Sequence, residues 1–192
     1  HDSRNDPGFA LHYSVEPAPG RHTNGAWLYY EMFQLWKTVK RAPRIGLVFM
    51  KSSKYKKDIN HARKSKLISE YTNVMNGAGA CLFGAFLGAK RIGIFDWLNA
   101  ATGWQLTPDQ YLDLGGNIQN LKQAFNIKHG IFPRDNKISD RLLGIPVQTK
   151  GANKGCKVDV DALMKDYWEL FGWDKDTGFP SQEIIDKVAS IS

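Results

Sequence analysis

The amino-acid sequence predicts a mainly α fold, and three observations support this prediction. Apolar residues recur at spacings of three and four along several segments, which is the period of an amphipathic helix. Helix-start residues precede these segments, most clearly at Thr107-Pro108-Asp109-Gln110. After residue 52, no segment alternates apolar and polar residues over the length of a strand.

The first 24 residues predict mostly irregular backbone, because Pro7, Pro17 and Pro19 interrupt any regular pattern. At most a short turn is expected at residues 9–13. Loops of this length are often functional. The segment ends in GRHTNG, where His22 lies between two glycines and can approach a substrate or cofactor closely. A loop histidine is more often simply solvated, so this segment alone leaves both interpretations open.

Residues 26–40 predict the first helix. Its apolar face is formed by residues spaced three and four apart, namely Leu28, Met32, Leu35, Trp36 and Val39. Pro43 then interrupts the pattern. Residues 45–50 form a short apolar piece, and a basic loop follows at residues 51–57.

A second helix is predicted from Asp58 to Met75. Its stop is expected at Asn76-Gly77, a pair suited to a left-handed C-terminal position. His61 is expected to lie on the charged surface of this helix, without a special role.

Residues 71–89 carry no charge, and Cys81 lies near their middle. Four glycines and three alanines surround the thiol, so backbone can come close to a bulky group. A free cysteine among small residues is usually just a buried apolar side chain. Residues 71–89 alone do not exclude this alternative. Cys81 is expected just past a helix end or at the start of the next helix, where backbone amides favour a thiolate and a metal–sulfur bond.

Four more helices are predicted, at residues 92–102, 108–129, 158–172 and 181–188. Thr107 and Gln110 form the pattern of a capping box at the start of the second of these helices. Its Gly115-Gly116 pair weakens an isolated helix by about 1 kcal/mol per glycine, so close packing against another element is expected. A turn-rich connection is expected at residues 131–156.

The net charge of +7 comes from one segment. Between Lys37 and Lys66 there are eleven basic residues and one acid, a local charge of +10, so the rest of the chain carries −3. No zinc-finger, RNP or helix-turn-helix signature accompanies the excess, which disfavours nucleic acid as a partner. A solvated surface or an acidic protein partner explains it at least as well.

Two cysteines, Cys81 and Cys156, lie in dissimilar surroundings and form no disulfide framework, which indicates a reducing compartment and a cytoplasmic location. The uncharged stretch at residues 71–89 makes a poor membrane span, because it contains polar residues and four glycines and because Lys90 and Arg91 follow at once. No membrane span is therefore expected.

Five motifs follow one another along the chain. They are NGAGACLF around Cys81, FDWLNAATGW at residues 95–104, LTPDQY at 106–111, GNIQNLKQAFN at 116–126 and YWELFGWDKDTGFPS at 167–181. In order and spacing they resemble the C-terminal region of the tungsten-containing aldehyde ferredoxin oxidoreductases. The opening HDSRNDPGFALHY resembles the DxR…LxYA element of the same family.

The resemblance implies irregular helical domains, the C-terminal helical domains of that fold. In the family, a bis-pterin tungsten centre lies beside a 4Fe–4S cluster, and an N-terminal β domain binds the pterin. Three cluster cysteines come from an upstream CxxCxxxC run, and the fourth matches Cys81. Since this chain contains no CxxC, it is expected to be a fragment that supplies one ligand of four and is inactive alone.

The family oxidises aldehydes to carboxylates, takes the oxygen from water and passes electrons through the cluster to ferredoxin. The resemblance therefore implies a ferredoxin or another electron-transfer subunit as partner. His22 matches a histidine that assists proton transfer, and Gly79 and Ala80 are implied to lie against the cofactors. Asn76 stands where the family has an aspartate that contacts a pterin, and Asn24 stands at the position of a frequent lysine.

Alternatives remain at this stage. The chain also resembles the tungsten subunit of class II benzoyl-CoA reductase, a ring-reducing relative. A non-catalytic helical binding module is a further alternative, with a docking surface at residues 51–66. We expect a division into residues 1–57, with the active-site loop, first helix and basic loop, and a helical body at residues 58–192. The choice of tungsten or molybdenum, the substrate and a homo-oligomeric state are left open.

Overall fold

The computed structural model describes residues 1–44, 54–87 and 92–190. In chain order its α-helices are α1 (Pro7–Val15), α2 (Trp27–Phe33), α4 (Ile59–Gly77), α5 (Leu82–Leu87), α6 (Ile94–Thr102), α7 (Pro108–Lys128), α8 (Asp140–Leu143), α9 (Val160–Leu170) and α10 (Gln182–Ala189). Short 3-10 turns are η1 (His22–Asn24), η2 (Leu35–Lys37) and η3 (Pro133–Asp135). Within the described ranges, the β pairing is limited to an isolated bridge between Trp173 and Pro180, so the mainly α prediction is confirmed.

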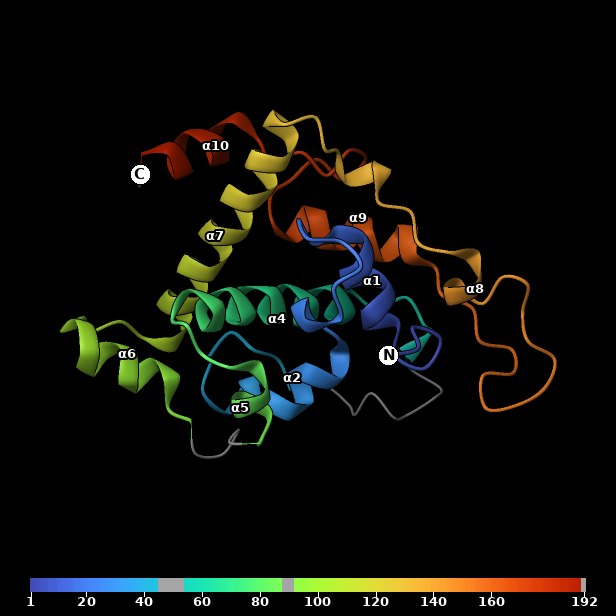
Figure 1. Cartoon of the computed structure of the whole chain (residues 1–192), viewed down its shortest axis with the longest axis horizontal. Coiled ribbons are helices and arrows are strands. Elements are labelled where there is room, and N and C mark those ends of the chain that lie inside the picture. Colours follow the sequence, from blue (N-terminus) through green and yellow to red (C-terminus); the bar gives the residue numbers. More distant parts are fainter. Residues whose placement is uncertain (45–53, 88–91, 191–192) are drawn as a thin grey trace.

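Helix α4 is the centre of the fold, and the other elements pack around it (Figure 1). Helix α7 crosses one end of α4, and α1 and α9 lie together on one side. Helices α2 and α5 lie on the opposite side. Two hydrophobic clusters follow from this arrangement. The larger joins α2, α4, α5, α6 and α7, and the smaller joins α1, α4 and α9.

The predicted ends of the long helices are confirmed by their caps. Asp58 caps α4 by accepting a hydrogen bond from the Asn60 amide at 2.9 Å. Thr107 and Gln110 form the full capping box at the start of α7. The stop of α4 falls at Gly77 as expected, but the left-handed residue is Gly79, with φ 68°, two positions later.

Close packing at Gly115 is also confirmed. A Cβ atom at this position would lie 2.1 Å from the carbonyl oxygen of Glu70 on α4, which is far inside van der Waals contact. The absent side chain therefore lets the backbones of α4 and α7 approach each other at their crossing. This approach offsets the weak helix propensity of glycine.

The prediction of irregular backbone before residue 24 was wrong for residues 7–15, which form α1. Asp6 accepts a hydrogen bond from the Gly8 amide at 2.8 Å, and Pro7 occupies the first helical turn. Proline fits that position because its missing N–H would have no helical partner there. Every residue of α1 is buried, so the helix lacks the polar face that makes an amphipathic pattern visible in a sequence.

The first predicted helix is shorter than expected. Helix α2 ends at Phe33, because Gln34 adopts a left-handed conformation with φ 52° and ψ 42°. A 3-10 turn, η2, follows. The predicted apolar face is confirmed in part, because Leu35 and Val39 are buried but Leu28, Met32 and Trp36 are only partly buried. Trp27, Tyr29 and Tyr30, which the predicted face left out, are buried.

The expectation that His61 lies on a charged surface was wrong. Its ring is 4% exposed and stacks on Trp27, with ring centroids 4.1 Å apart and an interplanar angle of 15°. On α4, Lys64 approaches the same indole, with its ammonium 4.2 Å from the ring centroid. Part of the α4 face that carries the basic residues therefore lies in the core. The apolar piece predicted at residues 45–50 and the first part of the basic loop lie outside the described residues.

Candidate functional site

The turn after α4 carries four of the predicted site residues, Asn76, Gly79, Ala80 and Cys81. It is closed by two backbone hydrogen bonds, from Gly79 to Asn76 at 3.1 Å and from Ala80 to Met75 at 2.9 Å. A Cβ atom added at Gly79 would meet nothing within 4 Å. The turn therefore presents bare backbone on an open side, where a large group has room to approach.

Cys81 stands directly before α5, as the sequence predicts, and its side chain is exposed. Asn76 and Gly79 are exposed as well, and Ala80 is half-buried. The neighbouring apolar side chains are also uncovered, since Phe83 is 67% and Leu87 is 92% exposed. A thiol beside open backbone and exposed apolar side chains suits a surface that receives a bulky group.

His22 begins the 3-10 turn η1 and is exposed. Its backbone carbonyl accepts a hydrogen bond from the Tyr29 hydroxyl at 3.0 Å. Asn24 ends the turn and is buried, and its side-chain nitrogen donates to the Ala18 carbonyl at 3.0 Å. The Asn24 amide thus holds the loop in shape, and its cofactor contact stays a prediction.

Helix α2 connects the His22 turn with the Cys81 segment. Tyr29 bonds to the His22 carbonyl through its hydroxyl, while its ring lies 4.7 Å from that of Phe86 on α5. Phe33 stacks on Phe86 at 5.2 Å. Burial raises the pKa of Tyr29 to about 12, and the neighbouring Tyr13 adds to the effect, so the hydroxyl stays a hydrogen-bond donor at neutral pH.

A cavity of about 250 Å³ opens beside Tyr29. The residues that line it come from the first loop, α1 and α2: His1, Asp2, Asn5, Asp6, Phe9, Leu28 and Tyr29. The ring of His1 lies 4.4 Å from that of His22, so this cavity adjoins the His22 turn.

The described residues do not assemble a metal site by themselves: among them, no group of three or more histidine, cysteine, aspartate or glutamate side chains lies close enough to hold an ion. Cys81 offers one exposed thiol with free space around the adjoining turn. The residues present therefore fit a role as one ligand to a group whose other ligands come from elsewhere.

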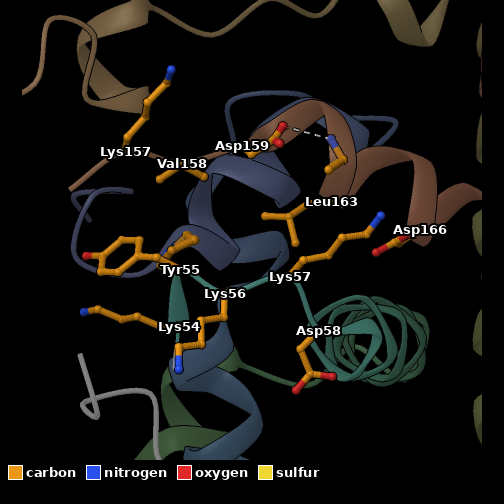
Figure 2. Close-up of a pocket in the computed structure, with 12 residues that line it drawn as sticks. Lys54, Tyr55, Lys56, Lys57, Asp58, Lys157, Val158, Asp159, Leu163 and Asp166 are labelled. Carbon is orange, nitrogen blue, oxygen red and sulfur yellow. Dashed lines mark hydrogen bonds between the residues drawn. The ribbon is translucent and has the colours of Figure 1, made fainter. Parts of the chain in front are cut away.

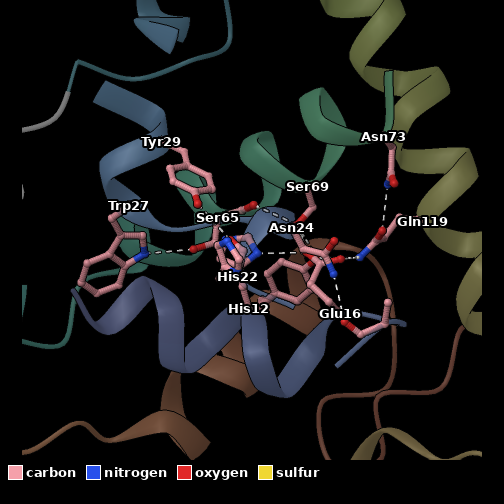
Figure 3. Close-up of polar contacts among 12 residues, drawn as sticks. His12, Glu16, His22, Asn24, Trp27, Tyr29, Ser65, Ser69, Asn73 and Gln119 are labelled. Atoms are coloured by element: carbon pink, nitrogen blue, oxygen red, sulfur yellow. Dashed lines mark hydrogen bonds and ion pairs between the residues drawn. The ribbon is translucent and has the colours of Figure 1, made fainter. Parts of the chain in front are cut away.

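A buried polar network, which no pattern in the sequence indicated, lies between α1, α4, α7 and α9 (Figure 3). Its centre is Glu16, which is 2% exposed. One carboxylate oxygen is 3.0 Å from His12 Nδ1 and accepts from the Ser69 hydroxyl, and the other accepts from Gln119 at 2.8 Å. The network continues through bonds of Gln119 to Asn73 at 2.8 Å and of Tyr167 to Ser69 at 2.9 Å.

These contacts keep Glu16 ionised although it is buried. Burial opposes the charge, but the hydrogen bond and charge of His12, with the bonds from Ser69 and Gln119, outweigh it and hold the pKa of Glu16 below its usual value. The participants lie on four helices and are far apart in the chain, from His12 to Tyr167, so no local pattern could reveal them. A buried carboxylate with its hydrogen-bonding capacity filled is a strong structural constraint.

The basic segment is divided between core and surface. Lys54 and Lys64 are 5% and 3% exposed, whereas Lys56, Lys57 and Arg63 are exposed. A cavity of about 110 Å³ lies beside residues 54–58 of this segment, and its lining includes the acids Asp58 before α4, Asp159 before α9 and Asp166 on α9 (Figure 2). The local charge around this cavity is therefore mixed. In the described part of the chain, no helix is long and apolar enough to cross a membrane.

Comparison with known proteins gives a consistent result. The family model described as aldehyde ferredoxin oxidoreductase, domains 2 and 3, matches residues 1–188. The tungsten-containing aldehyde ferredoxin oxidoreductase of Pyrococcus furiosus is 38% identical over 120 residues, and that of Pyrococcus horikoshii is 36% identical over 120 residues. The enzyme of Thermococcus kodakarensis is 35% identical over 119 residues.

These alignments cover 61 to 62% of this chain and 19% of each relative, so the chain spans about a fifth of the length of the curated relatives it matches. The family match, in contrast, extends over nearly the whole chain, from the first loop to α10. The helical architecture, the turn with Cys81 and the His22 loop all lie inside the matched region. The chain therefore belongs to the aldehyde ferredoxin oxidoreductase family, within the part of it described as domains 2 and 3.

Proposed function

We propose that this chain is the helical part of a tungstopterin, iron–sulfur oxidoreductase that oxidises aldehydes to carboxylates. In this reaction, water supplies one oxygen to the aldehyde carbon, and two electrons and three protons leave as the carboxylate forms. The observation that carries the proposal is the exposed turn at residues 76–81, with the Cys81 thiol beside open backbone. The names of the relatives support tungsten as the metal.

Within this proposal, Cys81 is the one ligand that the chain gives to a 4Fe–4S cluster. Gly79 and Ala80 let the cluster and a pterin approach the backbone, and Asn76 offers a side-chain amide to the pterin. When bound, the tungsten pterin and the cluster accept the two electrons and pass them on. The ligands that complete both groups belong to the β domain and CxxCxxxC run that we place outside this chain.

His22 is the proposed proton-transfer residue. Its side chain is exposed and adjoins the cavity beside Tyr29, and an imidazole exchanges protons readily near neutral pH. The backbone at His22 is fixed by Tyr29. We expect His22→Asn in the intact enzyme to lower kcat by about 100-fold, in the range of lost acid–base catalysis. His129→Asn, at an exposed histidine at the end of α7, is the control and is expected to leave kcat unchanged.

An acidic electron carrier such as ferredoxin is the proposed partner, and a reducing cytoplasm is the proposed location, because both cysteines are free thiols. The exposed basic residues offer a complementary surface, among them Lys37, Lys40, Lys56, Lys57 and Arg63. Reversing the charge of Lys56 and Lys57 is expected to raise the KM for ferredoxin at low salt, with a smaller effect at high salt.

The decisive experiment compares the two cysteines in the intact enzyme. Cys81→Ser is expected to abolish the electron paramagnetic resonance signal of the reduced cluster, since a hydroxyl is a poor iron ligand. Cys156→Ser is the matched control and is expected to keep the signal, because Cys156 lies on the loop before α9, outside this turn. A full cluster signal in Cys81→Ser would contradict the proposal.

A further inference from the structure

His12 lies at the centre of α1, is fully buried, and fills the variable position between Leu11 and Tyr13 in the DxR…LxYA element. Its Nδ1 atom is 3.0 Å from an oxygen of Glu16, one helical turn later. A carboxylate only accepts hydrogen bonds, so Nδ1 is the donor. Glu16 is in turn bonded to Ser69 on α4 and to Gln119 on α7. The imidazole is thus anchored to the rigid centre of the fold.

The face of the His12 ring lies against the loop that carries His22. A Cβ atom at Gly25 would lie 2.3 Å from Cε1, 2.5 Å from Nδ1 and 2.6 Å from Nε2 of His12. The Nε2 atom is buried and has no hydrogen-bond partner. Gly25 has φ 173°, an extended conformation that any residue adopts. Glycine is therefore required there by the imidazole and not by the backbone angles.

Other contacts fix the first part of this loop. The Gly20 amide donates to the Tyr13 carbonyl at 3.2 Å, and the Asn126 side chain donates to the Pro17 carbonyl at 2.7 Å. Tyr29 and Asn24 hold the turn η1 through their bonds to the His22 and Ala18 carbonyls. The ring of His12 meets the loop immediately after this turn, so it limits the position of the turn on the Gly25 side.

We propose that His12 is a positioning residue that places His22: Glu16 holds the imidazole, and the imidazole sets the position of Gly25 and of the turn before it. The effect on catalysis rests on the proposed function of His22, whereas the effect on the loop does not. Glu16 and His12 then form a link from the buried network to the candidate site.

A double-mutant cycle in the intact enzyme tests this link. His12→Asn keeps a donor near the position of Nδ1 but removes Cε1 and Nε2, two of the three ring atoms that lie against Gly25. Gly25→Ala adds a methyl group that collides with the ring. In the double variant, the space left by the ring receives the methyl group. The effects are therefore expected to be strongly non-additive, with His12→Asn suppressing the defect of Gly25→Ala.

The first readout is tryptic cleavage after Arg21, an exposed residue next to His22. Gly25→Ala is expected to speed this cleavage about tenfold, because proteolysis reports local opening of the loop. The double variant is expected to return to within about twofold of His12→Asn alone, since the collision is gone. His129→Asn, the control, is expected to leave the cleavage rate unchanged.

The second readout is aldehyde oxidation. The variants are expected to lower kcat in the order of their effect on the loop, with the KM for ferredoxin unchanged. If cleavage follows this order but neither these variants nor His22→Asn changes kcat, the proposed role of His22 fails and the positioning role stands. Additive effects on cleavage overturn the positioning role. If Gly25→Ala alone does not fold, recovery of folded protein in the double variant supports the proposal, and no recovery contradicts it.

Discussion

The buried network around Glu16 and the exposed turn around Cys81 differ sharply in burial, although they belong to the same fold. In the network, polar groups from four helices bond to one another and water is excluded. In the turn, backbone, thiol and large apolar side chains are all uncovered. A protein keeps exposed apolar side chains together mostly where something binds. The difference indicates that the network holds the structure, and it is consistent with the proposal that the turn receives a bound group.

The largest effect is expected at the centre of the network. Glu16→Ala removes the acceptor for His12, Ser69 and Gln119 at once and leaves buried donors without partners. Breaking a buried charged pair in this way costs about 3–5 kcal/mol of unfolding free energy. Thermal or denaturant unfolding measures the loss. Glu169→Ala, at an exposed glutamate of α9, is the control and is expected to change stability little.

A glycine comparison sharpens the same contrast. Gly115→Ala places a Cβ 2.1 Å from the Glu70 carbonyl and is expected to cost about 2–3 kcal/mol, because backbone on both helices has to move. Gly84→Ala, next to Cys81, places its Cβ an ordinary 3.6 Å from the Cys81 Cβ. It is expected to stabilise α5 by up to about 1 kcal/mol through helix propensity. Equal changes in the free energy of unfolding for Gly115→Ala and Gly84→Ala would contradict the difference in packing between the two glycines.

A smaller effect is expected from the buried Lys64. Burial lowers its pKa to about 8, although the nearby acids Asp6, Glu31 and Asp58 favour its charge. In the unfolded chain Lys64 keeps its proton up to about pH 10.5, whereas in the folded protein it loses the proton near pH 8. The free energy of unfolding therefore increases as pH rises from 8 to 10.5. Lys64→Met does not bury a charged ammonium, so below pH 8 the variant is expected to be about 1–3 kcal/mol more stable than the unsubstituted protein. This difference in the free energy of unfolding shrinks as pH rises from 8 to 10.5. Unfolding curves at pH 7 and pH 10 test the sign, and an advantage that grows with pH contradicts it.

The smallest effect on folding is expected from Cys81→Ser. The thiol is exposed, so the change is expected to alter the free energy of unfolding of this chain by less than about 0.5 kcal/mol. The same substitution is expected to remove the cluster from the intact enzyme. A large loss of stability in the metal-free protein would show that Cys81 supports the fold instead.

The long helices, their caps and the site turn could be predicted because their signals are local. Asp58, Thr107 and Gln110 act within one helical turn of their own position, and the Gly115-Gly116 pair indicated a close crossing. Helix α1 was missed because it begins with Pro7, is followed by Pro17 and Pro19, and is buried on all faces. His61 was misplaced because its neighbours in the sequence are charged, whereas its neighbour in space is Trp27.

The sequence by itself determined the helical class, the position of Cys81 at the start of a helix, and the family, because capping and motif order depend on residues close together in the chain. Only the tertiary structure decided which polar groups are buried with partners. Glu16, Gln119 and Tyr167 are far apart in the chain, and nothing in the residues next to each of them indicates a shared network. They become one network because α1, α7 and α9 pack on α4, and burial then makes an unpaired polar group costly. The same packing brings the ring of His12 against Gly25.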